Sequence, residues 1–145
     1  MAGSFVSPDL ERAAAPLLAA PGVFTRNYLS EREFWIAAAA VDAAINLRYP
    51  TAGETSAIGI QLMGLGKPVL LTEAEECSRF PEDACLRIAA GAAEYDSLRQ
   101  HMVLLTSIQE VARSIGRRAA GHIRDYHQLE QIAQKYWVTL CEVSG

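Results

Sequence analysis

One loop of the sequence gathers the residue types that hold a phosphate group and a sugar; it runs from Arg48 to Ser56. Gly53 lets the backbone approach a ligand closely. Thr55 and Ser56 are expected to open a helix whose free amides and positive dipole end suit a phosphate. Arg48 can add a bidentate, charge-assisted contact to the same phosphate, and Glu54 can accept hydrogen bonds from sugar or ribose hydroxyls. The loop therefore predicts a combined site for an anion and a polyol.

The same loop also has a purely structural interpretation. Thr55 and Ser56 could be helix caps, and Pro50 and Gly53 could be turn residues. Arg48 would then be a solvated surface charge. Spacing leaves both interpretations open.

A second segment, Gly64 to Lys67, has some of the residues of a phosphate-binding loop. The Walker pattern requires Gly, four residues and then Gly-Lys-Ser/Thr, whereas Pro68 directly follows Lys67 here. Gly66 is better placed as the C-cap of a helix that precedes a strand. We therefore predict a helix end at this segment.

Two charged segments each allow two interpretations. The acidic segment 73–76 follows a predicted strand, so it could contact ribose or a base, or it could be an exposed loop. A basic helical stripe could contact a membrane surface, or it could be an ordinary solvated helix face. Arg113, Arg117 and Arg124 share one helical stripe, and the adjacent Arg118 is counted with them.

The elements that position these segments alternate along the chain. Strand patterns occur at Val23–Asn27, Ala43–Leu47, Pro68–Thr72 and Cys85–Ile88. Helical patterns occur at Pro8–Ala20, Glu31–Val41 and Thr55–Leu65, and three more helices finish the chain. The last helix carries Tyr136 and Trp137 as core residues or as an interface. Strands separated by helical stretches predict βαβ units, so we expect one α/β layer sandwich with a parallel sheet over residues 1–145.

Composition excludes several functional classes. The 145 residues are 50% hydrophobic and 21% charged with a net charge of −4, which indicates an ordered domain and argues against a nucleic-acid binder. Cys77, Cys85 and Cys141 form no Cys-x-x-Cys pair and have no histidine at zinc-ligand spacing, so we expect free thiols in a reducing cytoplasm and no metal site. The sequence predicts neither a transmembrane segment nor a signal peptide.

The string from Asn46 to Ser56, followed by Gly64-x-Gly66-Lys67-Pro68-Val69, resembles the C-terminal, nucleotide-sugar-binding half of GT-B glycosyltransferases. The resemblance is to the retaining group that includes bacterial "group 1" glycosyltransferases. Segments 28–35 and 127–140 add supporting similarity. The resemblance implies a Rossmann-like three-layer domain with a short parallel sheet, of about four strands, flanked by helices. It also implies that the chain is a fragment without the N-terminal domain and the opening strands.

The resemblance assigns roles to individual residues. Glu54 takes the catalytic position beside the transferred sugar, and Gln61 stands where much of the group has the second Glu of a Glu-x7-Glu pattern, which binds ribose. Glu54 itself lies one residue from the position of the first Glu. The complete expected set for donor binding is Arg48, Thr51, Gly53, Thr55, Ser56 and Gln61.

The implied activity is transfer of a sugar from a nucleotide-diphospho-sugar to an acceptor hydroxyl, with no cofactor and no metal. The implied partners are the nucleotide-sugar and a separate N-terminal GT-B domain, which the reaction needs. A homo-oligomer and a peripheral contact with the inner membrane are further alternatives for this cytoplasmic protein. A different class of function also fits the sequence, a non-catalytic Rossmann-like interaction module that docks a partner through the helix with Tyr136 and Trp137.

Overall fold

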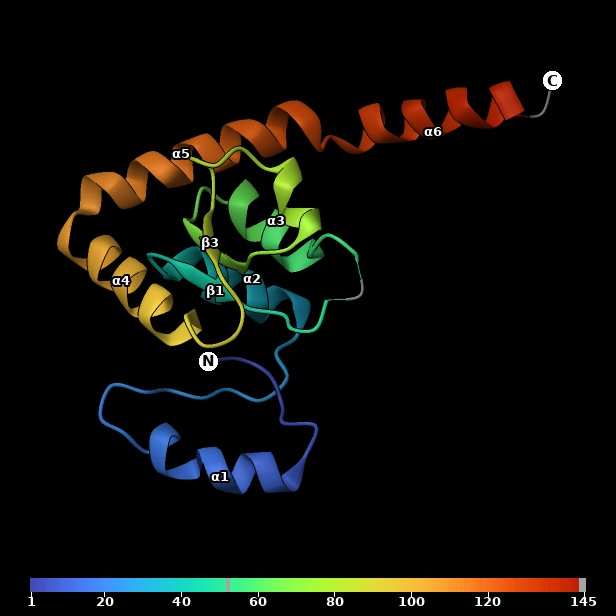
Figure 1. The fold of residues 1–145 in the computed structure, drawn as a ribbon. Coiled ribbons are helices and arrows are strands. Elements are labelled where there is room, and N and C mark those ends of the chain that lie inside the picture. Colours follow the sequence, from blue (N-terminus) through green and yellow to red (C-terminus); the bar gives the residue numbers. More distant parts are fainter. Residues whose placement is uncertain (52, 144–145) are drawn as a thin grey trace. The chain divides into compact units, whose positions relative to one another are not determined.

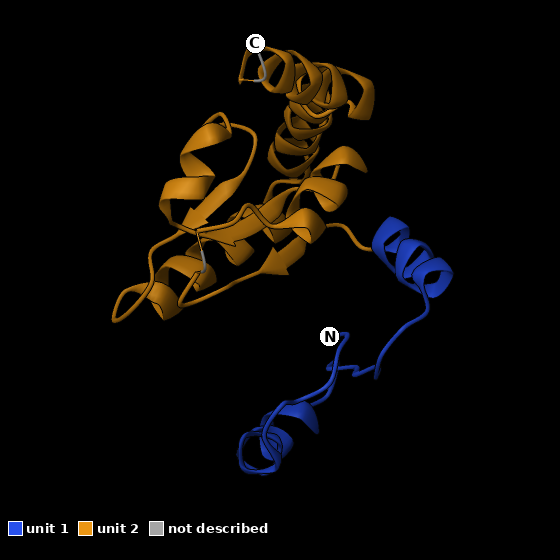
Figure 2. Ribbon diagram, turned by 90° about the vertical axis from the view of Figure 1, so that its right-hand side faces the viewer, with its two compact units in different colours: residues 1–40 blue, residues 41–145 orange. Residues whose placement is uncertain are grey.

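A computed structural model describes residues 1–51 and 53–143. The chain divides into two compact units, Met1–Ala40 and Val41–Gly145 (Figure 2). The expectation of one domain over residues 1–145 stays a prediction, and the sheet lies wholly within the second unit.

The first unit consists of two helices, α1 (Pro8–Leu18) and α2 (Glu31–Ala40). Ser7 caps α1, and the helix continues through Pro16 to Leu18. At the start of α2, the Ser30 N–H donates to the Glu33 carboxylate at 2.9 Å, and the Glu33 N–H donates to the Ser30 hydroxyl at 3.4 Å. This reciprocal pair is a capping box.

The prediction of a strand at Val23–Asn27 is wrong. In this segment only a single isolated bridge forms, between Ala2 and Arg26. Val23 and Phe24 are 41% and 78% exposed, so the segment has no covered face that would stabilise a ladder of strand pairs. A run of β-forming residues without burial is not sufficient for a strand.

The described part of the second unit contains one parallel sheet of three strands, β1 (Ala44–Asn46), β2 (Val69–Thr72) and β3 (Leu86–Ile88), in the order β1-β2-β3. Asn46 is paired with Leu71, and Thr72 with Ile88. All four residues of β2 are buried. The three strand predictions after residue 40 are therefore confirmed. The central strand, β2, is mostly apolar, as expected for a strand that is covered on both faces.

Helices cover both faces of this sheet (Figure 1). The helices of the second unit are α3 (Ala57–Gly64), α4 (Glu94–Ser107), α5 (Gln109–Tyr126) and α6 (Leu129–Val143), with a short 3-10 helix, η1 (Glu75–Arg79), after β2. On one face, Leu70 and Ile88 form a core cluster with Leu105 of α4 and Ile115 of α5. On the other, Leu71 contacts α3. Successive side chains of a strand point to opposite faces, so β2 joins the two layers.

Two glycines set the contact between α5 and the end of α3. Gly66 has a φ of +74°, and the Lys67 N–H donates to the Leu62 carbonyl at 3.2 Å, which is the Schellman motif expected at a glycine C-cap. A Cβ built on Gly116 would lie 2.0 Å from the Gly66 carbonyl oxygen. The backbones therefore meet at a distance that only glycine at position 116 allows.

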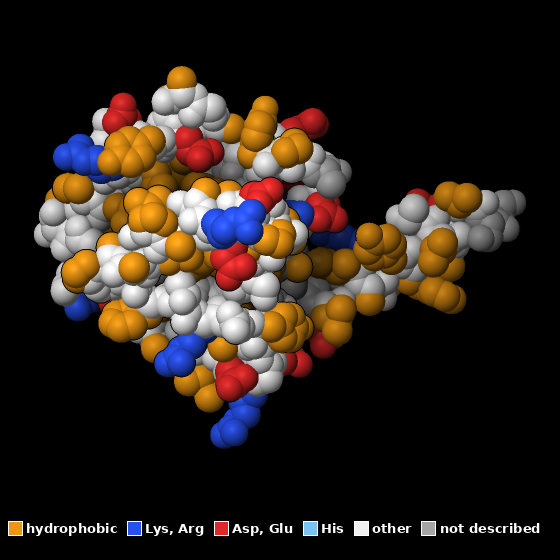
Figure 3. All heavy atoms as spheres, turned by 90° about the horizontal axis from the view of Figure 1, so that it is seen from below, with side chains coloured by type: hydrophobic (Ala, Val, Ile, Leu, Met, Phe, Trp, Pro, Cys, Tyr) orange, Lys and Arg blue, Asp and Glu red, His pale blue; other side chains and the backbone are white. Residues whose placement is uncertain are grey.

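The last two helices carry the basic stripe and the aromatic pair. Each arginine of the stripe contacts a neighbouring side chain of the protein, as in the ion pairs Arg117–Glu110 at 2.9 Å and Arg118–Asp83 at 3.0 Å. The stripe is thus a helix face with local polar partners. No described residue of α6 is buried, and Tyr136 and Trp137 are 69% and 64% exposed, so they are not core residues of the described chain. Figure 3 shows hydrophobic side chains along α6.

An aromatic cluster lies where η1 ends against the C-terminal turn of α5. Phe80 is buried, and its ring centroid lies 5.9 Å from those of both His122 and His127. The two histidine rings are 5.3 Å apart. Burial, together with the nearby positive charges of His122 and Lys135, lowers the pKa of His127.

This cluster predicts a pH dependence of stability. A histidine whose pKa is lower in the folded state binds fewer protons there than in the unfolded chain. The free energy of unfolding should therefore fall as the pH drops below about 6.5, the ordinary pKa of histidine. We expect urea unfolding at pH 7.5 and pH 5.5 to show this loss, and His127→Asn to reduce it. Equal losses in the two proteins would contradict the prediction.

A helix able to span a bilayer is not found among the described helices, because none combines the necessary length with enough apolar residues.

Candidate functional site

The candidate site lies at the carboxyl ends of β1 and β2, where a parallel α/β sheet usually binds its ligand. A small hollow, open to the solvent, lies there. β1 and the loop after it supply one wall, the start of α3 a second, and the end of β2 with η1 a third. The lining residues are Asn46, Arg48, Thr51, Glu54, Thr55, Ser56, Leu71, Thr72, Glu76, Cys77 and Phe80.

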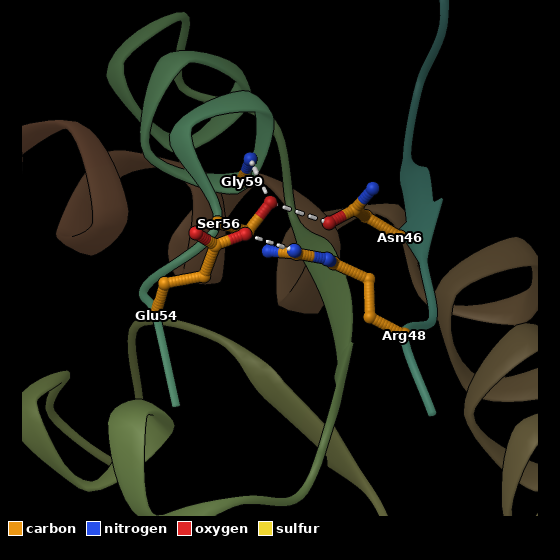
Figure 4. Close-up of polar contacts among 5 residues, drawn as sticks. All are labelled: Asn46, Arg48, Glu54, Ser56 and Gly59. Carbon is orange, nitrogen blue, oxygen red and sulfur yellow. Dashed lines mark hydrogen bonds and ion pairs between the residues drawn. The ribbon is translucent and has the colours of Figure 1, made fainter. Parts of the chain in front are cut away.

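The first turn of α3 is fixed in place by Ser56 (Figure 4). The Ser56 hydroxyl accepts a hydrogen bond from the Gly59 N–H at 3.1 Å and donates one to Asn46 Oδ1 at 2.6 Å. The N-cap therefore also ties the helix to the end of β1. Gly59 brings the helix close to the sheet, because a Cβ there would lie 3.1 Å from Leu71 Cδ2.

Ser56 therefore acts as a cap, as one of the two sequence interpretations predicts. The cap occupies one of the first-turn amides, and the other amides at a helix start have no partner within the helix. These amides and the positive end of the helix dipole remain suited to an anion. A structural role for Ser56 and an anion site at the same turn are thus compatible.

Arg48 is anchored at its backbone and paired at its side chain. Its N–H donates to the hydroxyl of buried Thr72 at 2.8 Å, which joins the loop after β1 to the end of β2. Its guanidinium donates to the Glu54 carboxylate at 2.5 Å (Figure 4). Side-chain exposure is 37% for Arg48 and 65% for Glu54. The residue expected to hold the phosphate and the residue expected to face the sugar therefore lie in contact with each other.

Gly53 and Thr55 complete the turn that leads into α3. Gly53 has a φ of +79°, a conformation that L side chains rarely adopt, and Thr55 lines the hollow. Ala52, inside the predicted loop, lies outside the described residues. Of the predicted donor-binding residues, the hollow gathers Arg48, Thr51, Thr55 and Ser56 beside Glu54.

Gln61 lies elsewhere. It is an exposed residue of α3 and does not line the hollow, so a ribose-binding role for it stays a prediction. A carboxylate from another element, Glu76 of η1, does line the hollow. A hydrogen bond from its own backbone N–H and one from the Thr51 side chain lower the pKa of Glu76, against the effect of desolvation. The nearby Arg48 acts in the same direction.

Several lining residues were not singled out in the sequence. Asn46 and Thr72 are the last residues of β1 and β2, so the rule that ligands bind at the carboxyl ends of strands could have indicated them. Cys77 and Phe80 come from η1 and carry no such signal. Cys77 and Cys85 are both buried, and desolvation raises the pKa values of the two thiols. They are therefore poor nucleophiles.

Within residues 1–51 and 53–143, no cluster of three or more acidic, histidine or cysteine side chains is placed to hold a metal ion.

Comparison with solved structures shows a similarity of fold. Sucrose-phosphate synthase from Thermosynechococcus elongatus superposes with a TM-score of 0.77 at 14% sequence identity, over 97% of this chain and 37% of that one. No family model and no curated protein match the chain. At this identity the likeness concerns the fold, and the chain spans little more than a third of the length of that synthase. It supports the expected α/β domain with a short parallel sheet flanked by helices, a fold that this glycosyltransferase shares.

Proposed function

We propose that the chain is the donor-binding half of a retaining GT-B glycosyltransferase that transfers a sugar from a nucleotide-diphospho-sugar to an acceptor hydroxyl. One observation carries this proposal. A paired arginine and glutamate, Arg48 and Glu54, meet a serine-capped helix start in one hollow at the carboxyl end of the sheet. The shared fold with sucrose-phosphate synthase supports it.

In this proposal the start of α3 and Arg48 hold the diphosphate. Amides at a helix start donate hydrogen bonds to phosphate oxygens, and the helix dipole adds a favourable field. The Arg48 guanidinium presents its N–H donors in a planar fork that matches two phosphate oxygens. Negative charge grows on the diphosphate as the glycosidic bond breaks, and fixed donors of this kind stabilise it most in that state.

Glu54 faces the transferred sugar in the proposal. Its carboxylate is more than half exposed at the rim of the hollow, and a carboxylate there can accept hydrogen bonds from sugar hydroxyls. In the ligand-free structure the ion pair with Arg48 holds that carboxylate beside the phosphate position. Retention of configuration follows from the resemblance to the retaining group of glycosyltransferases.

The acceptor would bind to a second Rossmann-like domain, and the reaction would take place between the two. On this proposal the 145-residue chain binds the donor weakly and does not turn it over. Within the GT-B glycosyltransferases, we propose that the chain belongs to the bacterial group 1 enzymes, which would place it in the cytoplasm.

An NMR titration tests the donor site directly. We expect UDP, GDP or ADP, free or sugar-linked, to shift the amide resonances of Gly53, Thr55 and Ser56 saturably. Resonances of α6 serve as an internal control, because α6 contributes no residue to the hollow. Saturable shifts for one nucleotide would also identify its base.

Absence of shifts at millimolar concentrations of all these ligands would contradict donor binding by this chain. The interaction module would then be the better hypothesis. The specific observation in its favour is α6, which exposes Tyr136 and Trp137 and has no buried residue among those described.

A further inference from the structure

One oxygen atom in the wall of the hollow has no hydrogen-bond partner in the part of the chain that the structure describes. Glu76 Oε1 is buried and has no hydrogen-bond partner among the described residues. The residue belongs to η1, directly after β2, and lines the hollow together with Arg48 and Thr51. The preceding residue, Glu75, is exposed, as is Glu73. Glu76 therefore differs from the rest of the acidic segment by facing the hollow.

The Glu76 carboxylate is held in its ionised form. The Thr51 side chain and the backbone N–H of Glu76 itself supply hydrogen bonds that favour the charged state, and positive Arg48 and Arg79 lie nearby. An ionised carboxylate accepts hydrogen bonds and donates none. A buried acceptor without a hydrogen-bond donor is unfavourable, so Oε1 requires a donor that residues 1–51 and 53–143 do not provide.

The charges in the hollow restrict which chemical group can donate a hydrogen bond to Glu76 Oε1. A phosphate oxygen would repel the carboxylate. A hydroxyl group can donate to a carboxylate oxygen at short range, and hydrogen bonds to charged acceptors are the stronger kind. If Arg48 and the start of α3 hold a diphosphate, the groups attached to it are a ribose and a sugar, and both carry hydroxyls.

We propose that Glu76 binds a hydroxyl group of the donor and makes the site selective for ligands that carry it. This inference rests on the proposed function. It places recognition of the hydroxyl on the segment after β2, whereas Gln61 lies on the exposed side of α3. Glu76 is a binding residue that touches the substrate away from the reacting bond.

Dissociation constants measured by the same NMR titration test the proposal. The probes are UDP, GDP and ADP, their 2′,3′-dideoxy counterparts and their sugar-linked forms. The wild-type chain should prefer a hydroxyl-bearing ligand over the counterpart that lacks the hydroxyl by about tenfold or more. Glu76→Gln should remove most of that preference, and Glu76→Ala should remove all of it. In the same helix, Glu75→Gln is the matched control and should leave every dissociation constant within about twofold.

Comparison of the different ligands identifies which hydroxyl Glu76 binds. Loss of preference between the ribo and dideoxy forms assigns it to the ribose, and an effect of Glu76→Gln limited to sugar-linked ligands assigns it to the sugar. Equal weakening of all ligands, or no change in either variant, would overturn the role of Glu76 while leaving donor binding intact. Failure of the wild-type chain to bind any probe would overturn the proposed function and this inference with it.

Discussion

Replacing Gly116 by alanine will destabilise the second unit by about 3 kcal/mol or more. The added Cβ would lie 2.0 Å from the Gly66 carbonyl oxygen and 2.9 Å from its carbonyl carbon. Both are backbone atoms, so no side chain can rotate away to relieve the clash. The α5 helix would have to move off the turn that ends α3. Urea unfolding followed by circular dichroism would measure the loss.

The control for this prediction is in the same helix. Gly121 also lies within α5, but a Cβ there would meet only the end of the flexible Arg124 side chain, at 3.7 Å. Because alanine is a better helix former than glycine, Gly121→Ala should be neutral or stabilising by up to about 1 kcal/mol. Equal effects of the two substitutions would contradict the close approach of α5 to Gly66.

We expect that replacing Arg48 by glutamine will weaken nucleoside diphosphate binding by about tenfold to a hundredfold. The ligand is the one that shifts the amide resonances of Gly53, Thr55 and Ser56 in the titration. The substitution removes the fixed positive charge beside the start of α3, and the α3 amides then bind the diphosphate without it. Fold stability should change little, because the ion pair with Glu54 is largely solvated and the Arg48 N–H still donates to Thr72. Titration of the variant, with unfolding as a check on integrity, measures both quantities.

Two further variants separate charge from geometry at this position. Arg48→Lys keeps the charge but loses the forked guanidinium, so an intermediate loss indicates bidentate contact with the phosphate. Arg99→Gln changes the net charge equally at an exposed position of α4 and should leave the affinity unchanged. A similar loss for Arg99→Gln and Arg48→Gln would show that only long-range charge matters.

The sequence was sufficient to predict most of the second unit. The run Pro68–Thr72 is apolar at every position but its ends, and it forms the central strand, while Gly66 marks the end of α3 through a positive φ. These signals are local, and burial on both faces agrees with them. At Val23–Asn27 the local propensity had no burial to support it, and the strand did not form.

The site was predictable only in part, because its geometry depends on contacts between distant segments. The loop 48–56 was correctly placed at the end of a strand. Its pairing with Thr72, 24 residues later, and the entry of Glu76 into the hollow depend on which strands are neighbours. The close approach at Gly116 depends on how two helices cross. A glycine inside a helical pattern often indicates such a close approach, but the sequence does not show which segment packs against it.

The ion pair between Arg48 and Glu54 gives the chain a built-in competitor for anions. Whenever the pair is closed, the Glu54 carboxylate holds a position on the guanidinium that a phosphate oxygen would otherwise use. A solvated pair of this kind contributes up to about 1 kcal/mol, so self-occupancy lowers the apparent affinity by no more than about fivefold. A phosphate that displaces the carboxylate frees it for another contact. If the proposed function is correct, arrival of the diphosphate and release of Glu54 toward the sugar are coupled events.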